Sequence, residues 1–182
     1  IGSYNSFVMN GGTVNLEDGG RIWIGTAKKN NPNSYQRMQL IAGTINLNGE
    51  GFITGNKRFI AADTYYPDDE NPVVVAQDTL AYNVIGLDGV TLNVKGAGNV
   101  IDAAGTEITA GSVTIEQGGV LTVRATTSTN QADNETLAQM LKGQSYIAVR
   151  DAGKLEVNGT LNVNVKELRL QEGGTIQMNA GS

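Results

Sequence analysis

The sequence predicts an all-β protein built as a β-solenoid, in which coils of about 21 residues stack on one another. A short motif recurs after a glycine or small residue, with apolar and polar residues alternating as in a half-buried strand. The copies also keep a fixed spacing. Leu92 precedes Val113 by 21 residues, and Leu155 precedes Ile176 by 21. Val113 and Leu155 are 42 residues apart, which is twice that interval. The strands of a β-sandwich are not expected to recur at such a fixed spacing in sequence.

The motif copies are the expected strands. They lie at residues 12–16, 43–47, 90–94, 112–115, 154–157, 159–163 and 174–178. Pairs of adjacent glycines at 11–12, 19–20, 118–119 and 173–174 separate them, and we expect these pairs to form turns that need positive φ. Glycine accounts for 24 of the 182 residues, about twice its usual share, as a turn-rich protein requires.

Three segments lack the strand pattern and are predicted to be loop insertions. They span about 26–38, 63–83 and 126–145. Within the second, residues 63–72 have the composition of a loop. Within the third, residues 134–143 predict one short helix, because Leu137, Met140 and Leu141 form an apolar stripe that a glycine follows. The insertions begin at a similar phase of the repeat, so we expect them to project from one side.

Composition excludes several classes of function. The chain has no Cys and no His, so it forms no disulfide, no thiolate or imidazole metal site and no His-dependent catalytic triad. Thirteen basic residues against eighteen acidic ones, a net charge of −5, argue against a nucleic-acid partner. No apolar stretch approaches the ~18 residues of a membrane-spanning helix. We expect one domain or fragment over 1–182, with no cofactor, no metal and no membrane insertion by this segment.

Aromatic and acidic residues in or beside the insertions are the candidate ligand-binding residues. Loop tyrosines offer contact area at low entropic cost, although they can equally pin loops to the scaffold. The neighbouring carboxylates could bind calcium or act as a glycosidase acid–base pair, but a solvated acidic loop is the simpler interpretation. The candidates are Tyr35, Tyr65, Tyr66, Asp68, Asp69, Glu70, Tyr82 and Tyr146. No catalytic residue is assigned.

Asparagine recurs at one position of the strand motif. The residues are Asn15, Asn46, Asn93 and Asn162. A polar binding stripe is one interpretation. The simpler one is a ladder of stacked amides that hydrogen-bond from strand to strand, or an outward position that only needs to be polar.

The Gly-Gly-Thr-Val-Asn-Leu and Gly-Gly-Val-Leu-Thr-Val strings resemble passenger domains of bacterial autotransporters and two-partner-secretion adhesins. The resemblance covers most of the chain outside the insertions. It implies a right-handed parallel β-helix that is secreted or displayed on the bacterial cell surface. We therefore expect an adhesin or structural fibre segment that contacts a glycan, a host or neighbouring-cell protein, or its own copies end to end or laterally. The alternative is a β-helical polysaccharide-degrading enzyme, a lyase or tailspike-type glycosidase, which needs only two acid–base groups.

Overall fold

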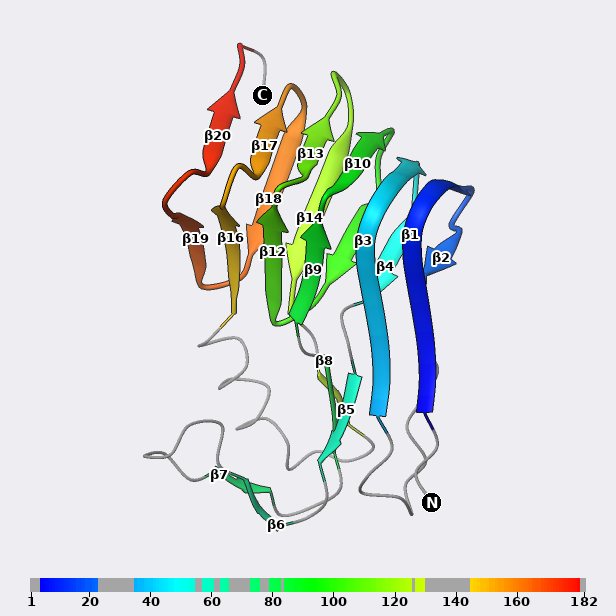
Figure 1. The fold of residues 1–182 in the computed structure, drawn as a ribbon, viewed down its shortest axis with the longest axis vertical. Coiled ribbons are helices and arrows are strands. Elements are labelled where there is room, and N and C mark those ends of the chain that lie inside the picture. The colour runs from blue at the N-terminus through cyan, green and yellow to red at the C-terminus, as the bar shows by residue number, and fades with distance from the viewer. Residues whose placement is uncertain are drawn as a thin grey trace.

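The structure is a computed structural model. It describes residues 4–22, 35–54, 57–60, 63–65, 73–75, 79–82, 84–125, 127–129 and 145–180. These residues form strands, turns and bends, and no helix occurs among them (Figure 1).

The strands follow one another in short segments, except for two long ones near the N-terminus. In chain order they are β1 (Tyr4–Glu17), β2 (Arg21–Ile22), β3 (Tyr35–Asn48), β4 (Phe52–Thr54), β5 (Lys57–Ile60), β6 (Asp63–Tyr65), β7 (Val73–Val75), β8 (Thr79–Tyr82), β9 (Val84–Asp88), β10 (Val90–Lys95), β11 (Asn99–Asp102), β12 (Gly105–Thr109), β13 (Ser112–Ile115), β14 (Val120–Arg124), β15 (Thr127–Thr129), β16 (Tyr146–Arg150), β17 (Lys154–Val157), β18 (Thr160–Asn164), β19 (Glu167–Leu170) and β20 (Thr175–Met178).

Two main sheets enclose the core. The larger has 13 strands and follows the order β19-β16-β12-β9-β3-β10-β13-β17-β20, with β1 on the other side of β3 and β5, β8 and β15 attached beside it. The two ends of this order, β19 and β20, are both strands near the C-terminus, so the sheet is nearly closed and barrel-like. The second sheet is parallel throughout and follows the order β18-β14-β11-β4-β2.

The predicted β-solenoid is wrong, because its expected coils do not remain separate layers of short strands. β3 is continuous over 14 residues and pairs with both β9, at Leu40 opposite Leu87, and β10, from Gly43 opposite Val90 onward. This long strand therefore connects the set β9, β12, β16 and β19 to the set β10, β13, β17 and β20 in one barrel-like sheet. The predicted helix at 134–143 lies outside the described residues.

The glycines at 11–12 and 43 explain the error. Gly11 and Gly12 were expected to form a turn and Gly43 to begin a strand, yet all three lie inside β1 and β3, where the pairing register shifts as in a β-bulge. Gly43 has φ of +118°, and a Cβ there would lie 2.7 Å from the carbonyl oxygen of Gly12. Glycine therefore lets the two long strands bend together without ending.

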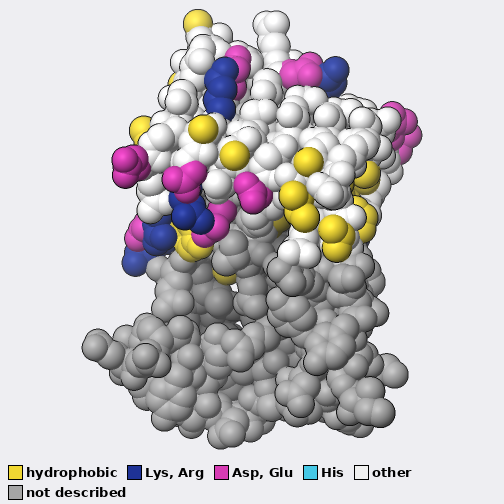
Figure 2. Space-filling view, in the orientation of Figure 1, with side chains coloured by type: hydrophobic (Ala, Val, Ile, Leu, Met, Phe, Trp, Pro, Cys, Tyr) yellow, Lys and Arg dark blue, Asp and Glu magenta, His cyan; other side chains and the backbone are white. Residues whose placement is uncertain are grey.

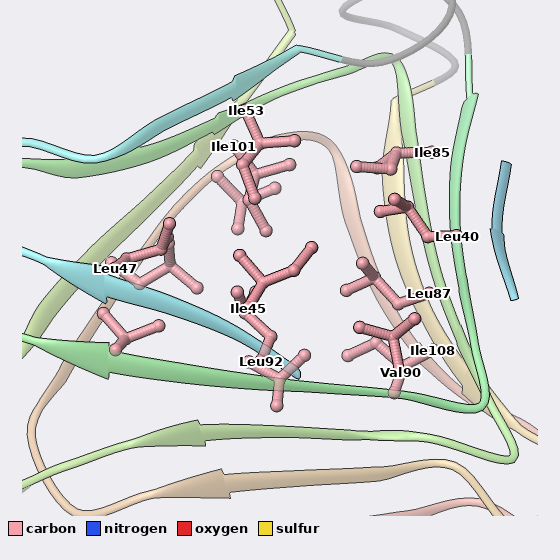
Figure 3. Close-up of a cluster of buried hydrophobic side chains, with 14 of the residues drawn as sticks. Leu40, Ile45, Leu47, Ile53, Ile85, Leu87, Val90, Leu92, Ile101 and Ile108 are labelled. Carbon is pink, nitrogen blue, oxygen red and sulfur yellow. The ribbon is translucent and has the colours of Figure 1, made fainter. Parts of the chain in front are cut away.

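The core is made of apolar rows that run across neighbouring strands. Leu92 lies opposite Ile45 on one side and Val113 on the other, and Leu155 lies opposite both Val113 and Ile176. Parallel pairing places like-facing side chains beside one another. Figure 3 shows side chains from the barrel-like sheet, such as Ile45 and Leu92, pointing toward Ile53 and Ile101 of the second sheet. All four are at most 1% exposed, so the rows form one closed apolar interior.

A buried asparagine holds the corner between β10 and β11. The Oδ1 of Asn99 accepts hydrogen bonds from the backbone N–H groups of Gly49 and Gly51, at 3.2 and 3.1 Å. Its Nδ2 donates to the carbonyl oxygens of Lys95 and Gly96, both at 2.9 Å. The side chain is fully buried, and its amide satisfies backbone groups that the turn leaves without strand partners.

Candidate functional site

Residues of the three predicted insertions join β5, which lies outside them, in one antiparallel extension of the larger sheet. We call β5, β8 and β15 (residues 57–60, 79–82 and 127–129) the insertion sheet. β5 pairs with the first residues of β3, where the first insertion ends, at Tyr35 opposite Arg58. β8 of the second insertion pairs with β5, and β15 of the third pairs with β8. Three segments distant in sequence are thus hydrogen-bonded at one edge of the sheet, near β3 in Figure 1.

The structure places the predicted binding residues unequally. Tyr35 begins β3, Tyr82 ends β8 opposite Lys57, and Tyr65 lies in β6 opposite Val73 of β7. Residues 63–65 are therefore strand, although they were expected to be loop. Four further candidates, Tyr66, Asp68, Asp69 and Glu70, lie outside the described residues. The backbone pairing brings Tyr35 and Tyr82 to opposite sides of β5 in the same ladder.

Tyr146 is the candidate whose side-chain contacts are defined, and it lies on β16, which pairs with β12 and β19 and with no strand of the insertion sheet. Its hydroxyl donates a 2.9 Å hydrogen bond to Oε1 of Glu107 on β12. The hydroxyl end of the ring lies against Gly105, where a Cβ would be 2.7 Å from Cζ. The guanidinium of Arg169 on β19 lies over the ring, 4.2 Å from its centroid.

Arginines and glutamates complete a network around this ring, the Tyr146 cluster (Glu107, Tyr146, Arg150, Glu167 and Arg169). Arg150 donates to Oε2 of Glu107 at 3.0 Å, and Arg169 donates to Oε2 of Glu167 at 2.7 Å. The cluster thus links three neighbouring strands. Figure 2 shows Lys, Arg, Asp and Glu side chains gathered over the region of β16 and β19.

The electrostatics of the Tyr146 cluster are those of a structural network. Burial, with the hydrogen bond to Glu107 second, raises the pKa of Tyr146 to about 12. The hydrogen bond from Arg169 lowers the pKa of Glu167, and the hydrogen bond to Glu107 raises the pKa of Arg150. The phenol is therefore a neutral donor at physiological pH and no general base. Its ring and hydroxyl both contact neighbouring residues, so Tyr146 pins strands together.

The expected asparagine ladder forms on three strands. Asn46 donates a hydrogen bond from Nδ2 to Oδ1 of Asn15 at 2.8 Å. Asn93 likewise donates from Nδ2 to Oδ1 of Asn46 at 2.9 Å. Asn162 does not join, because β18 belongs to the second sheet, and its Nδ2 lies 3.3 Å from Oγ1 of Thr122. Since the amides of Asn15, Asn46 and Asn93 bond to one another, they form a structural seam across β1, β3 and β10.

Sequence reasoning missed the partners of Tyr146. Glu107 and Arg150 are 39 and 4 residues from Tyr146 in sequence, and only their outward, alternating positions on strands could have drawn attention to them. Within the described ranges no group of three or more Asp or Glu side chains is placed to hold a metal ion. Over those same ranges, no helix has the length and hydropathy required to cross a membrane.

Compared with protein-family models, curated proteins and solved structures, the chain matches none of them.

Proposed function

We propose that this chain is the binding segment of a secreted or surface-displayed bacterial adhesin, which contacts a glycan or a protein of a neighbouring surface through its three insertions. The observation that carries the proposal is the pairing of β3, β5, β8 and β15, which gathers three insertions at one edge of an ordered scaffold. The resemblance of the strand motifs to adhesin passengers supports the same assignment.

The scaffold suits a display function. Its inward residues, such as Ile45, Leu87 and Leu92, are completely buried, so the sheet that carries the insertions is well packed. Binding residues commonly lie on connecting segments held by such a rigid framework. Pairing between insertions also lowers the entropy that a ligand would otherwise have to remove on binding.

The candidate contacts are the tyrosines and carboxylates of the insertions. Tyr35 and Tyr82 lie on paired strands of the ladder, and Tyr65 ends the strand that leads into residues 66–72. Aromatic rings and carboxylates together are the usual means of recognising sugar rings and their hydroxyl groups. Tyr146 is not among the proposed contacts, because its ring and hydroxyl are already engaged.

A binding assay with matched variants tests the proposal. The purified chain is applied to a printed array of neutral and acidic polysaccharides and to whole bacterial cells. We expect the Tyr65→Ala/Tyr66→Ala double variant to lose binding at least ~tenfold, as truncated aromatic hot spots do. The Tyr146→Phe variant, whose lost hydrogen bond is internal, is the control and should bind as the native chain does.

Two outcomes would count against the proposal. Binding that survives deletion of residues 66–72 combined with Tyr65→Ala would exclude the second insertion as the contact. Turnover of an acidic polysaccharide, abolished by Asp68→Ala or Asp69→Ala, would instead make the chain an enzyme. Far-UV circular dichroism of each variant shows that the scaffold is retained.

A further inference from the structure

Two arginines lie over one aromatic ring on the outer face of the second sheet. The guanidinium of Arg21 on β2 is 5.5 Å from the ring centroid of Phe52 on β4, and the guanidinium of Arg124 on β14 is 6.0 Å from it. Arg21 is directly opposite Phe52 in the register, whereas Arg124 reaches the ring across β11. Because guanidinium groups favour the face of an aromatic ring, Phe52 holds two positive charges close together.

These side chains point away from the core. Arg21 and Phe52 precede Ile22 and Ile53, which are buried in the interior, and successive residues of a strand face opposite sides of a sheet. Arg21 is exposed, Phe52 is half-buried, and the side chain of Arg124 is 46% exposed. Their exposure therefore follows from the face of the sheet that they occupy and not from the position of a sheet edge.

Both arginines keep hydrogen-bond donors that no neighbouring residue uses. Arg124 donates from Nε to Oδ2 of Asp102 at 3.1 Å, and this carboxylate, whose side chain is 4% exposed, holds the guanidinium in place. The two terminal nitrogens of Arg124 make no hydrogen bond within the described residues, and Arg21 makes no ion pair with any of them. Since a guanidinium has five N–H donors, most of this capacity is available to a ligand.

A third arginine over a ring shows the contrasting, satisfied arrangement. Arg169 lies 4.2 Å from the ring centroid of Tyr146, and its Nε donates to Glu167 at 2.7 Å. Glu167 is two residues away on the same strand, so the charge of Arg169 is matched locally. Arg21 has no such carboxylate in the described part of the chain, and an unmatched guanidinium favours an anionic partner.

Apolar and hydroxyl side chains continue the row of Arg21 across the sheet. Phe52 lies opposite Val100 of β11, and Val100 lies opposite Thr122 of β14. All three residues are half-buried, so part of each contacts solvent. From Arg21 to Thr122 the row crosses three strand spacings of ~4.8 Å, about 14 Å in total. We call this surface the Phe52 strip (Arg21, Phe52, Val100, Thr122 and Arg124).

We propose that the Phe52 strip binds a short acidic oligosaccharide, with the carboxylate of a uronic acid residue on the two guanidinium groups. A planar carboxylate matches the paired N–H donors of a guanidinium, and such charge-assisted hydrogen bonds are stronger than neutral ones. Phe52 and Val100 offer apolar area to the C–H face of a sugar ring, and Thr122 offers its hydroxyl to a sugar hydroxyl group.

The distribution of charge along the chain favours an anion at this surface. The whole chain has a net charge of −5, but residues 1–60, which supply β2 and β4, contain six Lys and Arg against three Asp and Glu. This net positive part of the chain favours the approach of an anionic ligand. A nucleic acid fits less well, since its phosphates are bound by a longer run of basic residues. The inference stands on the second sheet alone and is independent of the proposed contact through the insertions.

Isothermal titration calorimetry of the purified 182-residue chain with a hyaluronan tetrasaccharide tests the proposal. We expect methyl esterification of the carboxylates, which removes the charge and keeps the sugar rings, to weaken binding at least ~tenfold. Arg21→Gln, at an exposed position, and Phe52→Leu, which removes the ring, should each weaken binding of the acid at least ~tenfold. The matched control is Arg169→Gln, which removes a partly exposed arginine from a ring on the larger sheet and should leave binding unchanged.

Several results would overturn the proposal. They are no heat of binding at millimolar concentrations, equal affinity for the acid and its ester, and native affinity in both Arg21→Gln and Phe52→Leu. A loss in Arg169→Gln as large as that in Arg21→Gln, or equal affinity for a single-stranded oligonucleotide of the same charge, would also overturn it, because either result indicates general attraction of anions. Far-UV circular dichroism shows that each variant is folded.

The same assay separates this inference from the proposed adhesin function. The Tyr65→Ala/Tyr66→Ala variant should bind the tetrasaccharide as the native chain does, because neither residue belongs to the Phe52 strip. Retained binding of that variant to cells and to the polysaccharide array would count against the proposed function and leave the strip unaffected. Loss of tetrasaccharide binding by that variant would place the acidic saccharide on the insertions and overturn the present proposal.

Discussion

The hydroxyl of Tyr146 donates a 2.9 Å hydrogen bond to Oε1 of Glu107, which lies diagonally across from it on the neighbouring strand. The direct neighbours in the register are Gly105 opposite Tyr146 and Ala148 opposite Glu107. These two small residues leave room for the ring to lie along the sheet and reach the carboxylate. The contact therefore depends on four positions at once, two large and two small.

This contact predicts a pH dependence of stability in the alkaline range. In the folded chain the pKa of Tyr146 is raised from 10.0 to about 12, so the folded state retains a proton that the unfolded chain loses near pH 10. The contribution is complete below about pH 10 and is lost as the pH rises through about 12. Urea unfolding at pH 8 and pH 11 should show the native chain losing stability relative to Tyr146→Phe. A stability gap that stays constant with pH would contradict the raised pKa of Tyr146, whose main cause is burial of the phenol and whose second is its hydrogen bond to Glu107.

The repeated motif made part of the fold predictable. Alternation of apolar and polar residues identifies strands locally, and equal spacing identifies which residues lie opposite one another, as with Leu92 and Val113. Both signals fail at Gly43. A glycine at the start of a motif copy predicts that a strand begins there, yet Gly43 lies inside a strand of 14 residues, opposite a register shift at Gly11 and Gly12. That single continuity changes the architecture from separate coils to a barrel-like sheet.

The site was less predictable because its contacts are between distant segments without a shared pattern. Nothing in the sequence around Lys57 or Thr127 indicates that both flank β8. The exposure of Leu170 and Met178 was also not predictable, because the residues of β19 and β20 follow the same alternation as buried ones. Exposure there depends on the absence of a covering strand among the described residues, which no local pattern encodes.

The asparagine ladder predicts a pH-dependent effect of Asn46→Asp. An aspartate at position 46 still accepts from Asn93, but its ionised form cannot donate to Oδ1 of Asn15. We expect a loss of about 1 kcal/mol of stability at pH 7, the usual value for one hydrogen bond. The loss should shrink at about pH 3, where an aspartic acid is protonated and donates again.

Chemical denaturation at both pH values measures this effect. The control is Asn162→Asp, because Asn162 is exposed and its Nδ2 makes only a 3.3 Å contact with Thr122. Equal losses for the two variants at pH 7 would show that the ladder contributes nothing beyond a surface amide.

A buried hydroxyl in the core predicts a stabilising substitution. Thr106 is 1% exposed and lines a small apolar cavity with Ile101, Leu121 and Ile147, and its Oγ1 has no hydrogen-bond partner among the described residues. Thr106→Val keeps the shape and removes the desolvated hydroxyl, so we expect a gain of about 1 kcal/mol. Thr91→Val, at a half-exposed outward position, should change stability little. Thermal unfolding of both variants checks the prediction, and a destabilised Thr106→Val would show that the hydroxyl is hydrogen-bonded.

The pair Gly118–Gly119 predicts opposite tolerances at adjacent positions. Gly118 has φ of +75° with no atom within 4 Å of an added Cβ, whereas a Cβ on Gly119 would lie 2.5 Å from the carbonyl oxygen of Val94. Asparagine tolerates the left-handed region, so Gly118→Asn should cost under about 1 kcal/mol. Gly119→Ala forces two backbones apart and should cost about 1–3 kcal/mol or more, as overpacking does. Urea unfolding of the two variants gives the comparison directly. A cost for Gly118→Asn that equals or exceeds that of Gly119→Ala would mean that the turn conformation, and not the approach of Gly119 to β10, requires glycine here.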